Sequence, residues 1–243
     1  MSRVLMSARE RIIIPLDFPN PDNAKAVIGT LAGQVGAFKI GRVAIDGGFG
    51  HDMAGYAIED GQLVFWDNKM SDIPNTSGEA MKSTKKRLAL GLWATNIHAN
   101  SGHDSIKAMV EEAGATSVWA VTLLTSITAD QCEELFGAPP EIIVRRWAGI
   151  ALRQGVHGII CSPQEVKMLR KEYGDDFELV TPGVRPAGSD TQDQARVDTP
   201  GNAVVNGADY TVIGRPITGA PDPVAAAKAI AQEIEEALSK PIQ

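Results

Sequence analysis

Short apolar runs alternate with helical stretches along this chain from Arg11 onward. Each run is almost continuously hydrophobic rather than alternating, which is typical of parallel strands buried on both faces. Polar or glycine-rich residues end each run and separate it from the next helical stretch. We therefore predict eight strands, at residues 12–16, 37–40, 63–66, 93–97, 118–123, 158–161, 178–181 and 210–213.

Helix-start signals follow these runs. Ser162-Pro163-Gln164-Glu165, for example, combines a capping serine, a first-turn proline and amide or acidic residues. Eight strands that are each followed by a helix indicate an α/β fold of the (β/α)8 TIM-barrel type. A doubly wound open sheet is the alternative, although it seldom has eight such even units. The predicted helices cover residues 20–32, 45–57, 75–90, 101–113, 139–154, 162–173, 198–207 and 223–240.

The domain organisation follows from the length and from the evenness of this pattern. The chain has 243 residues, a length at which one α/β barrel folds as a single domain. No linker or low-complexity segment interrupts it. We expect one domain over residues 11–243, preceded by a loose N-terminal extension over residues 1–10.

The amino-acid composition limits which partners the protein is expected to bind and in which cellular compartment it is expected to lie. The net charge of −7 argues against nucleic acid or an anionic membrane as a partner, although a local basic pocket can still bind a small anion. Cys132 and Cys161 form neither a disulfide framework nor a zinc pattern, and the four histidines are too scattered for a metal site. No apolar run has transmembrane length and no signal-peptide core is present, so we expect a cytoplasmic protein without a membrane partner.

Three charged residues follow the third predicted strand. Asp67, Lys69 and Asp72 lie within six positions, and residues two apart on a strand point to the same side. Charges at the end of a buried strand are costly to desolvate unless they pair with one another or with a ligand. A solvated surface charge group is the alternative interpretation of so short a pattern.

Other polar residues fall at the same end of the predicted barrel. The active sites of this fold lie at the carboxyl ends of the strands, so the convergence favours a catalytic rim over a surface charge group. The residues at these positions are Asp17, Lys39, Asp67, Lys69, Asp72, His98, Asn100, Thr122, Thr125, Arg185 and Arg215.

Two segments suit a phosphate group. After the eighth strand, Gly214 offers an exposed backbone N–H beside the guanidinium of Arg215, whose planar fork matches phosphate oxygens. After the seventh strand, residues 183–196 form a polar loop that is long for a strand-to-helix connection, as lids and binding loops often are. A surface loop and a surface arginine are the alternative for either segment alone, but together they favour a phosphorylated ligand.

A set of motifs in this order resembles the orotidine 5′-phosphate decarboxylase family, whose members catalyse the last step of UMP synthesis. The resemblance covers almost the whole chain from Arg11, and its most specific part is Asp-x-Lys-x-x-Asp-Ile-Pro-Asn-Thr at residues 67–76. Met70 and Ser71 depart from it, because many bacterial members carry an aromatic residue and a histidine there. The remaining motifs are Leu-Asp-Phe at 16–18, Phe-Lys-Ile-Gly at 38–41, Thr-Pro-Gly-Val-Arg-Pro at 181–186 and Val-Ile-Gly-Arg-Pro-Ile at 212–217.

The resemblance implies a decarboxylation without a cofactor or metal, in a homodimer with shared active sites. Lys69 would deliver a proton to C6 of the pyrimidine of orotidine 5′-phosphate (OMP). Asp67 would lie beside the substrate carboxylate, and Lys39 would complete an alternating charge array. Asp72 would reach the active site of the other subunit.

The resemblance also implies how the rest of OMP is bound. Asp17 and Lys39 would bind the ribose hydroxyls, with Thr76 contributing from the partner subunit. Thr125 would lie near the pyrimidine, and a short helix over residues 130–139 would cover that side. The phosphate would be held by Gln194, Gly214 and Arg215, with Arg185 close by on the mobile loop.

Two other functions remain open on the sequence alone. One is a magnesium-dependent sugar-phosphate decarboxylase or aldolase of the same barrel superfamily, whose members share the Asp-x-Lys-x-x-Asp core but generally continue it differently. The other is a nucleotide-binding barrel without catalysis. The latter is expected to have lost Lys69 or Asp67, and both are present.

Overall fold

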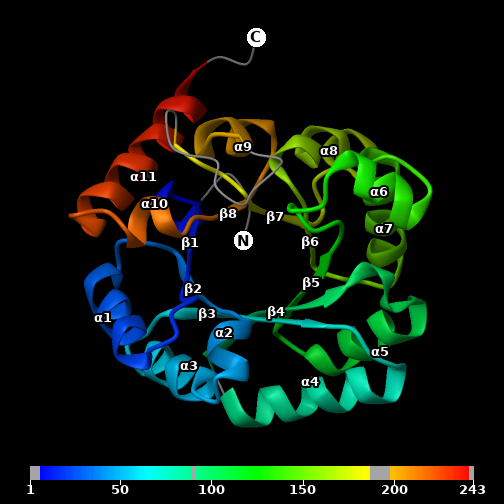
Figure 1. Ribbon diagram of the computed structural model, residues 1–243, viewed down its shortest axis with the longest axis horizontal. Helices are drawn as coiled ribbons and strands as arrows, with labels where there is room; N and C mark the ends of the chain where they lie inside the picture. Colours follow the sequence, from blue (N-terminus) through cyan, green and yellow to red (C-terminus); the bar gives the residue numbers. More distant parts are fainter. Residues whose placement is uncertain (1–5, 89–90, 187–197, 241–243) are drawn as a thin grey trace.

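A closed barrel of eight parallel strands forms the centre of the molecule (Figure 1). The computed structural model describes residues 6–88, 91–186 and 198–240. Strands pair in chain order and the first pairs with the last, which confirms the predicted barrel and rules out the open sheet. The strands are β1 (Ile12–Pro15), β2 (Ala37–Ile40), β3 (Leu63–Met70), β4 (Leu92–His98), β5 (Ser117–Val121), β6 (Gly158–Ile160), β7 (Glu178–Pro182) and β8 (Tyr210–Val212).

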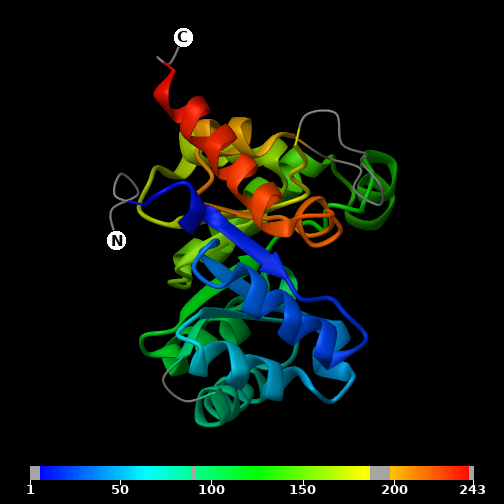
Figure 2. The same cartoon turned by 90° about the vertical axis from the view of Figure 1, so that its left-hand side faces the viewer.

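The larger helices surround the strands as an outer layer (Figure 2). Short additional helices lie in the loops after β2, β5 and β8. The α-helices are α1 (Pro21–Leu31), α2 (Arg42–Asp46), α3 (Gly50–Glu59), α4 (Pro74–Leu88), α5 (His103–Ala113), α6 (Ala129–Phe136), α7 (Pro140–Arg153), α8 (Val166–Tyr173), α9 (Pro200–Asn206), α10 (Arg215–Thr218) and α11 (Pro223–Ser239). The 3-10 helices are η2 (Arg9–Arg11), η4 (Ala99–Ser101) and η5 (Pro163–Glu165).

Side-chain caps account for several helix boundaries. The Asn20 side chain accepts a hydrogen bond from the backbone N–H of Asp22 at the start of α1, as the sequence predicts. At α6, Thr128 and Gln131 form a reciprocal capping box, and Gly137 ends the helix in the left-handed conformation. α6 thus occupies the segment in which a short helix is expected.

Two elements differ from the sequence prediction. β3 continues to Met70 instead of ending at Trp66, so Asp67 and Lys69 belong to the strand itself. The helix expected over residues 45–57 is two helices, α2 and α3, separated near Gly48, whose φ is +82°. Glycine adopts this backbone conformation without the steric cost of a Cβ atom, which allows the chain to turn there.

Aromatic rings fill the amino-terminal half of the barrel interior. The ring of Trp119 lies 4.7 Å from that of Phe65 and 4.9 Å from that of Trp93, and Trp93 lies 5.0 Å from Tyr210. The indole N–H of Trp119 donates to Glu178 at 2.6 Å. This packed floor leaves the carboxyl ends of the strands as the place for a cavity.

The end of the N-terminal segment packs against the barrel. Ala8 is buried, and the guanidinium of Arg11 donates to the backbone carbonyl of Asp209. The turn at residues 9–11 thus packs beside the amino end of β8. None of the helices in the described ranges is both long and apolar enough to cross a membrane.

Candidate active site

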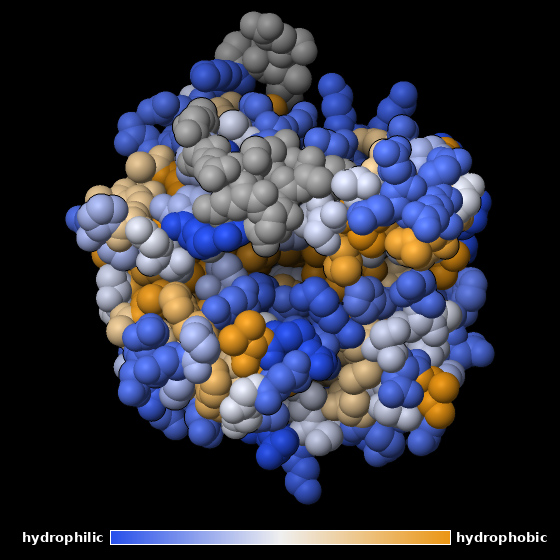
Figure 3. Space-filling view, in the orientation of Figure 1, coloured by the Kyte–Doolittle hydropathy of each residue, from blue (hydrophilic) through white to orange (hydrophobic). Residues whose placement is uncertain are grey.

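A cavity of about 520 Å³ opens at the carboxyl end of the barrel, and all eight strands or the loops that follow them contribute to its wall. Its mouth is the hollow near the centre of Figure 3. Apolar groups, including Phe65, Val121 and Ile160, form much of the wall. The predicted site residues that line it are Asp17, Lys39, Asp67, Lys69, Thr125, Arg185, Gly214 and Arg215.

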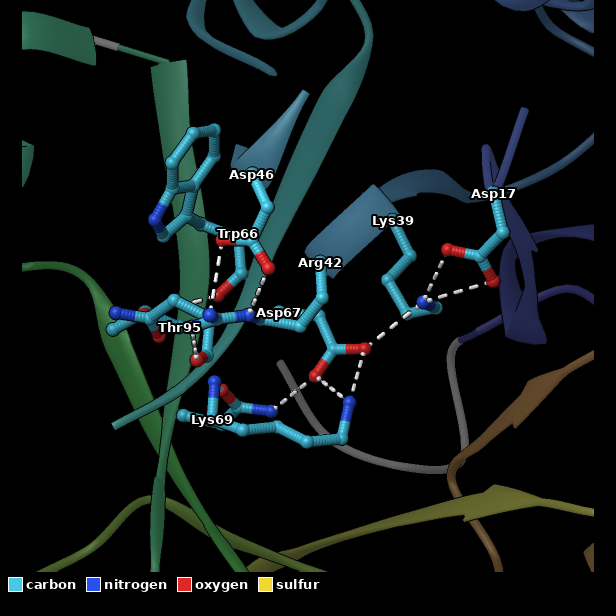
Figure 4. Close-up of polar contacts among 10 residues, drawn as sticks. Asp17, Lys39, Arg42, Asp46, Trp66, Asp67, Lys69 and Thr95 are labelled. Atoms are coloured by element: carbon cyan, nitrogen blue, oxygen red, sulfur yellow. Dashed lines mark hydrogen bonds and ion pairs between the residues drawn. The ribbon is translucent and has the colours of Figure 1, made fainter. Parts of the chain in front are cut away.

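Four charged side chains alternate in sign along one wall of the cavity (Figure 4). The Lys39 ammonium lies 3.3 Å from Asp17 Oδ1 and 2.9 Å from Asp67 Oδ2. Lys69 Nζ donates to both carboxylate oxygens of Asp67, at 2.7 and 2.8 Å. β1, β2 and β3 therefore bring Asp17, Lys39, Asp67 and Lys69 into one continuous array.

Lys39 and Asp67, in the middle of this array, are the most buried of its four residues, so their charges depend most on ion pairing. Asp67 and Lys39 are 4% and 8% exposed. Burial raises the pKa of Asp67, but the ammonium groups of Lys39 and Lys69 outweigh that effect and hold its pKa below the ordinary value. Burial likewise lowers the pKa of Lys39, and the carboxylates of Asp67 and Asp17 raise it to above the ordinary value. Both groups are therefore charged at neutral pH.

Asn96 is a site residue that the sequence analysis missed. Its amide Nδ2 donates to Asp67 Oδ1 at 2.6 Å, and its Oδ1 accepts from the backbone N–H of Lys69 at 2.7 Å. The predicted site residues lie at strand ends, whereas Asn96 lies within β4 and is fully buried. A polar residue inside an apolar run was the available signal, because burying an amide is costly unless it is hydrogen bonded.

The loops after β7 and β8 form the neighbouring part of the wall, beside β1, and they carry Arg185, Gly214 and Arg215. Gly214 lies just before α10, and a Cβ atom there would come within 2.9 Å of the Pro15 side chain. Only glycine therefore allows β8 and β1 to lie this close at the cavity. Arg185 is buried and donates to the carbonyl of Val184, while Arg215 is exposed at the mouth.

Two predicted site residues do not reach the cavity of their own chain. Asp72 is exposed, and its carboxylate accepts a hydrogen bond from the backbone N–H of Ile73 at 2.7 Å. Thr76 is exposed on α4. Neither lines the cavity. Gln194 lies outside the described residues, as do residues 187–196 of the predicted loop.

His98, at the end of β4, is half-buried near the array. Burial lowers its pKa, and the nearby Lys69 ammonium lowers it further. It is therefore neutral at physiological pH. Among the side chains that the structure describes, no three His, Cys, Asp or Glu residues are grouped closely enough to hold a metal ion.

Comparison with known proteins agrees with this geometry. The model of the "Orotidine 5′-phosphate decarboxylase / HUMPS family" matches residues 10–230. The chain belongs to this family. The resemblance recognised from the motifs is therefore confirmed.

Alignments with similar proteins of this family cover nearly the full length of this chain and of each relative. A protein of Moorella thermoacetica named orotidine 5′-phosphate decarboxylase is 41% identical over 243 residues, which cover 96% of this chain and 95% of that protein. One of the same name from Anaeromyxobacter sp. strain K is 43% identical and covers 93% and 99% of the two chains. The crystal structure of orotidine 5′-phosphate decarboxylase from Lactobacillus acidophilus matches with a TM-score of 0.79 and 35% identity, covering 92% of this chain and 98% of that one.

Proposed function

We propose that this protein decarboxylates OMP to UMP and carbon dioxide, the last step of pyrimidine nucleotide biosynthesis, without a metal or cofactor. The alternating array Asp17–Lys39–Asp67–Lys69 carries the proposal, because it holds an ammonium group over an otherwise largely apolar cavity. Relatives of about this length that carry the decarboxylase name support it.

We assign the three parts of OMP to three regions of the cavity. Arg215 at the mouth and Arg185 beside it supply positive charge for the phosphate, together with the backbone at Gly214. Asp17 and Lys39 are the proposed ligands of the ribose hydroxyls. The pyrimidine then reaches towards Lys69, with Thr125 on the β5 side of the cavity. Gln194 is a further proposed phosphate ligand.

The chemical step needs positive charge where negative charge develops. The bond between C6 and the carboxylate breaks, carbon dioxide leaves, and the electron pair stays on C6. The Lys69 ammonium stabilises that carbanion and then transfers its proton to C6, which yields UMP. The resulting neutral amine takes a proton from water before the next turnover.

Asp67 has two proposed effects in this step. Its ion pair fixes the position of the Lys69 ammonium, since both carboxylate oxygens accept from it. Its negative charge also lies on the side where the substrate carboxylate binds, and that repulsion disappears when carbon dioxide leaves. The main contribution to the rate is the differential stabilisation of the carbanion by Lys69.

The active protein is proposed to be a homodimer in which Asp72 and Thr76 complete the partner's site. Both residues are exposed and neither lines the cavity of its own chain, although they follow Lys69 closely in sequence. Ile73 between them is 65% exposed, the most exposed of the large hydrophobic side chains described. In the proposed dimer this side chain would be buried against the second copy.

The test is an assay with EDTA present that follows the ultraviolet change as OMP becomes UMP. We expect the wild type to turn over and Lys69→Ala to lose nearly all activity. Lys82→Ala is the matched control, because Lys82 makes an ion pair of 2.8 Å with Glu79 on the exposed face of α4. Activity that EDTA abolishes would instead favour a magnesium-dependent sugar-phosphate enzyme, and UMP binding without turnover would favour a binding protein.

A further inference from the structure

The segment of β3 that carries Asp67 and Lys69 does not follow the regular strand ladder. Trp66 is opposite Thr95 and Met70 is opposite Ile97, so three residues of β3 face the single residue Asn96 of β4. The extra residues form a bulge, a feature that redirects side chains near active sites. Lys69 has a φ of +49° and is the only non-glycine residue with a positive φ among those described.

A left-handed backbone at a lysine persists only where its surroundings hold it in place. The Asn96 side chain provides such a restraint, since its Oδ1 accepts from the Lys69 backbone N–H. The same amide donates from Nδ2 to Asp67 Oδ1. With one end acting as acceptor and the other as donor, a single buried side chain links the two charged residues of the bulge.

We propose that Asn96 is a positioning residue for the decarboxylation. Asn96 fixes the Lys69 backbone and the Asp67 carboxylate relative to each other. It thereby fixes the place from which the ammonium reaches C6. This inference rests on the proposed function. Because Asn96 acts on the transition-state geometry and binds neither ribose nor phosphate, its loss lowers kcat far more than it changes KM.

Asn96→Leu removes both hydrogen bonds and keeps the branching of the side chain, although its methyl groups are larger than the amide atoms that they replace. We expect kcat to fall about 10²-fold, the loss typical of a displacement of about 1 Å at a catalytic group. KM for OMP and the affinity for UMP should change little. Thr95→Val is the matched control, because the Thr95 hydroxyl donates to the Trp66 carbonyl at 3.1 Å and is equally buried on β4 (Figure 4). It should lower Tm but leave kcat near that of the wild type.

Asn96→Asp separates positioning from a purely structural role. The introduced carboxyl lies within hydrogen-bond distance of Asp67, and two such carboxyls share a proton because both cannot easily be ionised. When protonated, it donates to Asp67 and accepts from the Lys69 N–H as the amide does. When ionised, it repels Asp67. The ratio of variant to wild-type kcat should therefore be highest at acidic pH and fall as pH rises.

Other groups around Asn96 do not produce this pattern. Asp67 and Lys69 on β3, Lys39 on β2 and His98 on β4 are present in both proteins, so their titration largely cancels in the ratio. On β5 the residue opposite Asn96 is Trp119, which does not titrate.

The proposal is overturned if Asn96→Leu keeps near-wild-type kcat, or if the kcat ratio for Asn96→Asp does not vary with pH. An equal loss of kcat in Thr95→Val would also overturn it, as would failure of both Asn96 variants to fold, since Asn96 would then be structural. A wild type that binds UMP but does not decarboxylate OMP refutes the proposed function instead, and the two failures are thus distinguishable.

Discussion

Lys69 Nζ donates to both oxygens of Asp67, a residue two positions earlier in the same strand. Strand alternation predicts that the two side chains share a face, and they do. The bulge adds to this relationship by giving the Lys69 backbone a left-handed conformation. The ion pair at the centre of the site is thus local in sequence, whereas the groups that hold it come from β2 and β4.

Removing the charge of Asp67 should affect both stability and catalysis. Asp67→Asn leaves the buried Lys39 with Asp17 as its remaining carboxylate, so we expect the free energy of unfolding to fall by about 1–3 kcal/mol. We also expect kcat to fall by at least about 10²-fold, because the Lys69 ammonium loses its fixed position. Chemical denaturation and steady-state kinetics measure the two effects. Glu111→Gln, in an exposed pair on α5, should change neither.

Loss of the arginine at the mouth should reduce turnover as well as affinity. Binding energy from the phosphate helps to organise the distant reacting groups, so Arg215→Ala is expected to lower kcat and to raise KM. Lys107→Ala removes an exposed cation on α5 and serves as the control. An Arg215→Ala enzyme with unchanged kcat and only a raised KM would show that the phosphate contributes affinity alone.

If the active sites are shared as proposed, two inactive variants should complement each other. Lys69→Ala and Asp72→Ala are each expected to be nearly inactive as homodimers. Random exchange of subunits makes half of the dimers mixed, and one of the two sites in each mixed dimer then carries neither substitution. Activity should therefore return to about a quarter of the wild-type value, as the two-fold symmetry of such a dimer requires. No recovery after verified exchange would contradict the sharing of sites.

Glu178, which accepts from Trp119 in the barrel floor, should make the free energy of unfolding depend on pH. Burial raises the pKa of Glu178, only partly offset by the hydrogen bond from Trp119, and the charge of Asp209 raises it further. As pH rises above the ordinary glutamate pKa, the unfolded chain loses this proton before the folded one, so the folded state loses stability. This contribution to stability is present at acidic pH and is lost as pH rises through the raised pKa.

Glu178→Gln removes this titration while keeping an acceptor for the Trp119 indole N–H. The stability of the variant relative to the wild type should therefore be greater at pH 7 than at pH 4, measured by chemical denaturation. The exposed Glu133→Gln is the control and should show no such trend. A difference between variant and wild type that does not change with pH would contradict this prediction.

The sequence predicts the barrel and most of the cavity because the information is local. Continuous apolar runs indicate buried parallel strands, and the residues after them must lie on one rim, as Asp17, Lys39 and Arg215 do. The bulge at Lys69 and the role of Asn96 depend on the register between β3 and β4, which no local pattern specifies. The break between α2 and α3 was missed although Gly47 and Gly48 lie at that point.

The aromatic floor bears on how small molecules enter and leave the cavity. Phe65, Trp93, Trp119 and Tyr210 pack edge to face across the amino-terminal half of the barrel, below the cavity. In the proposed reaction carbon dioxide forms beside Lys69, and these packed rings lie between it and the amino-terminal end of the barrel. We therefore expect the gas and the nucleotide to leave by the same mouth through which the substrate enters. The gas must then pass the bound nucleotide. The nucleotide leaves after it through the same opening.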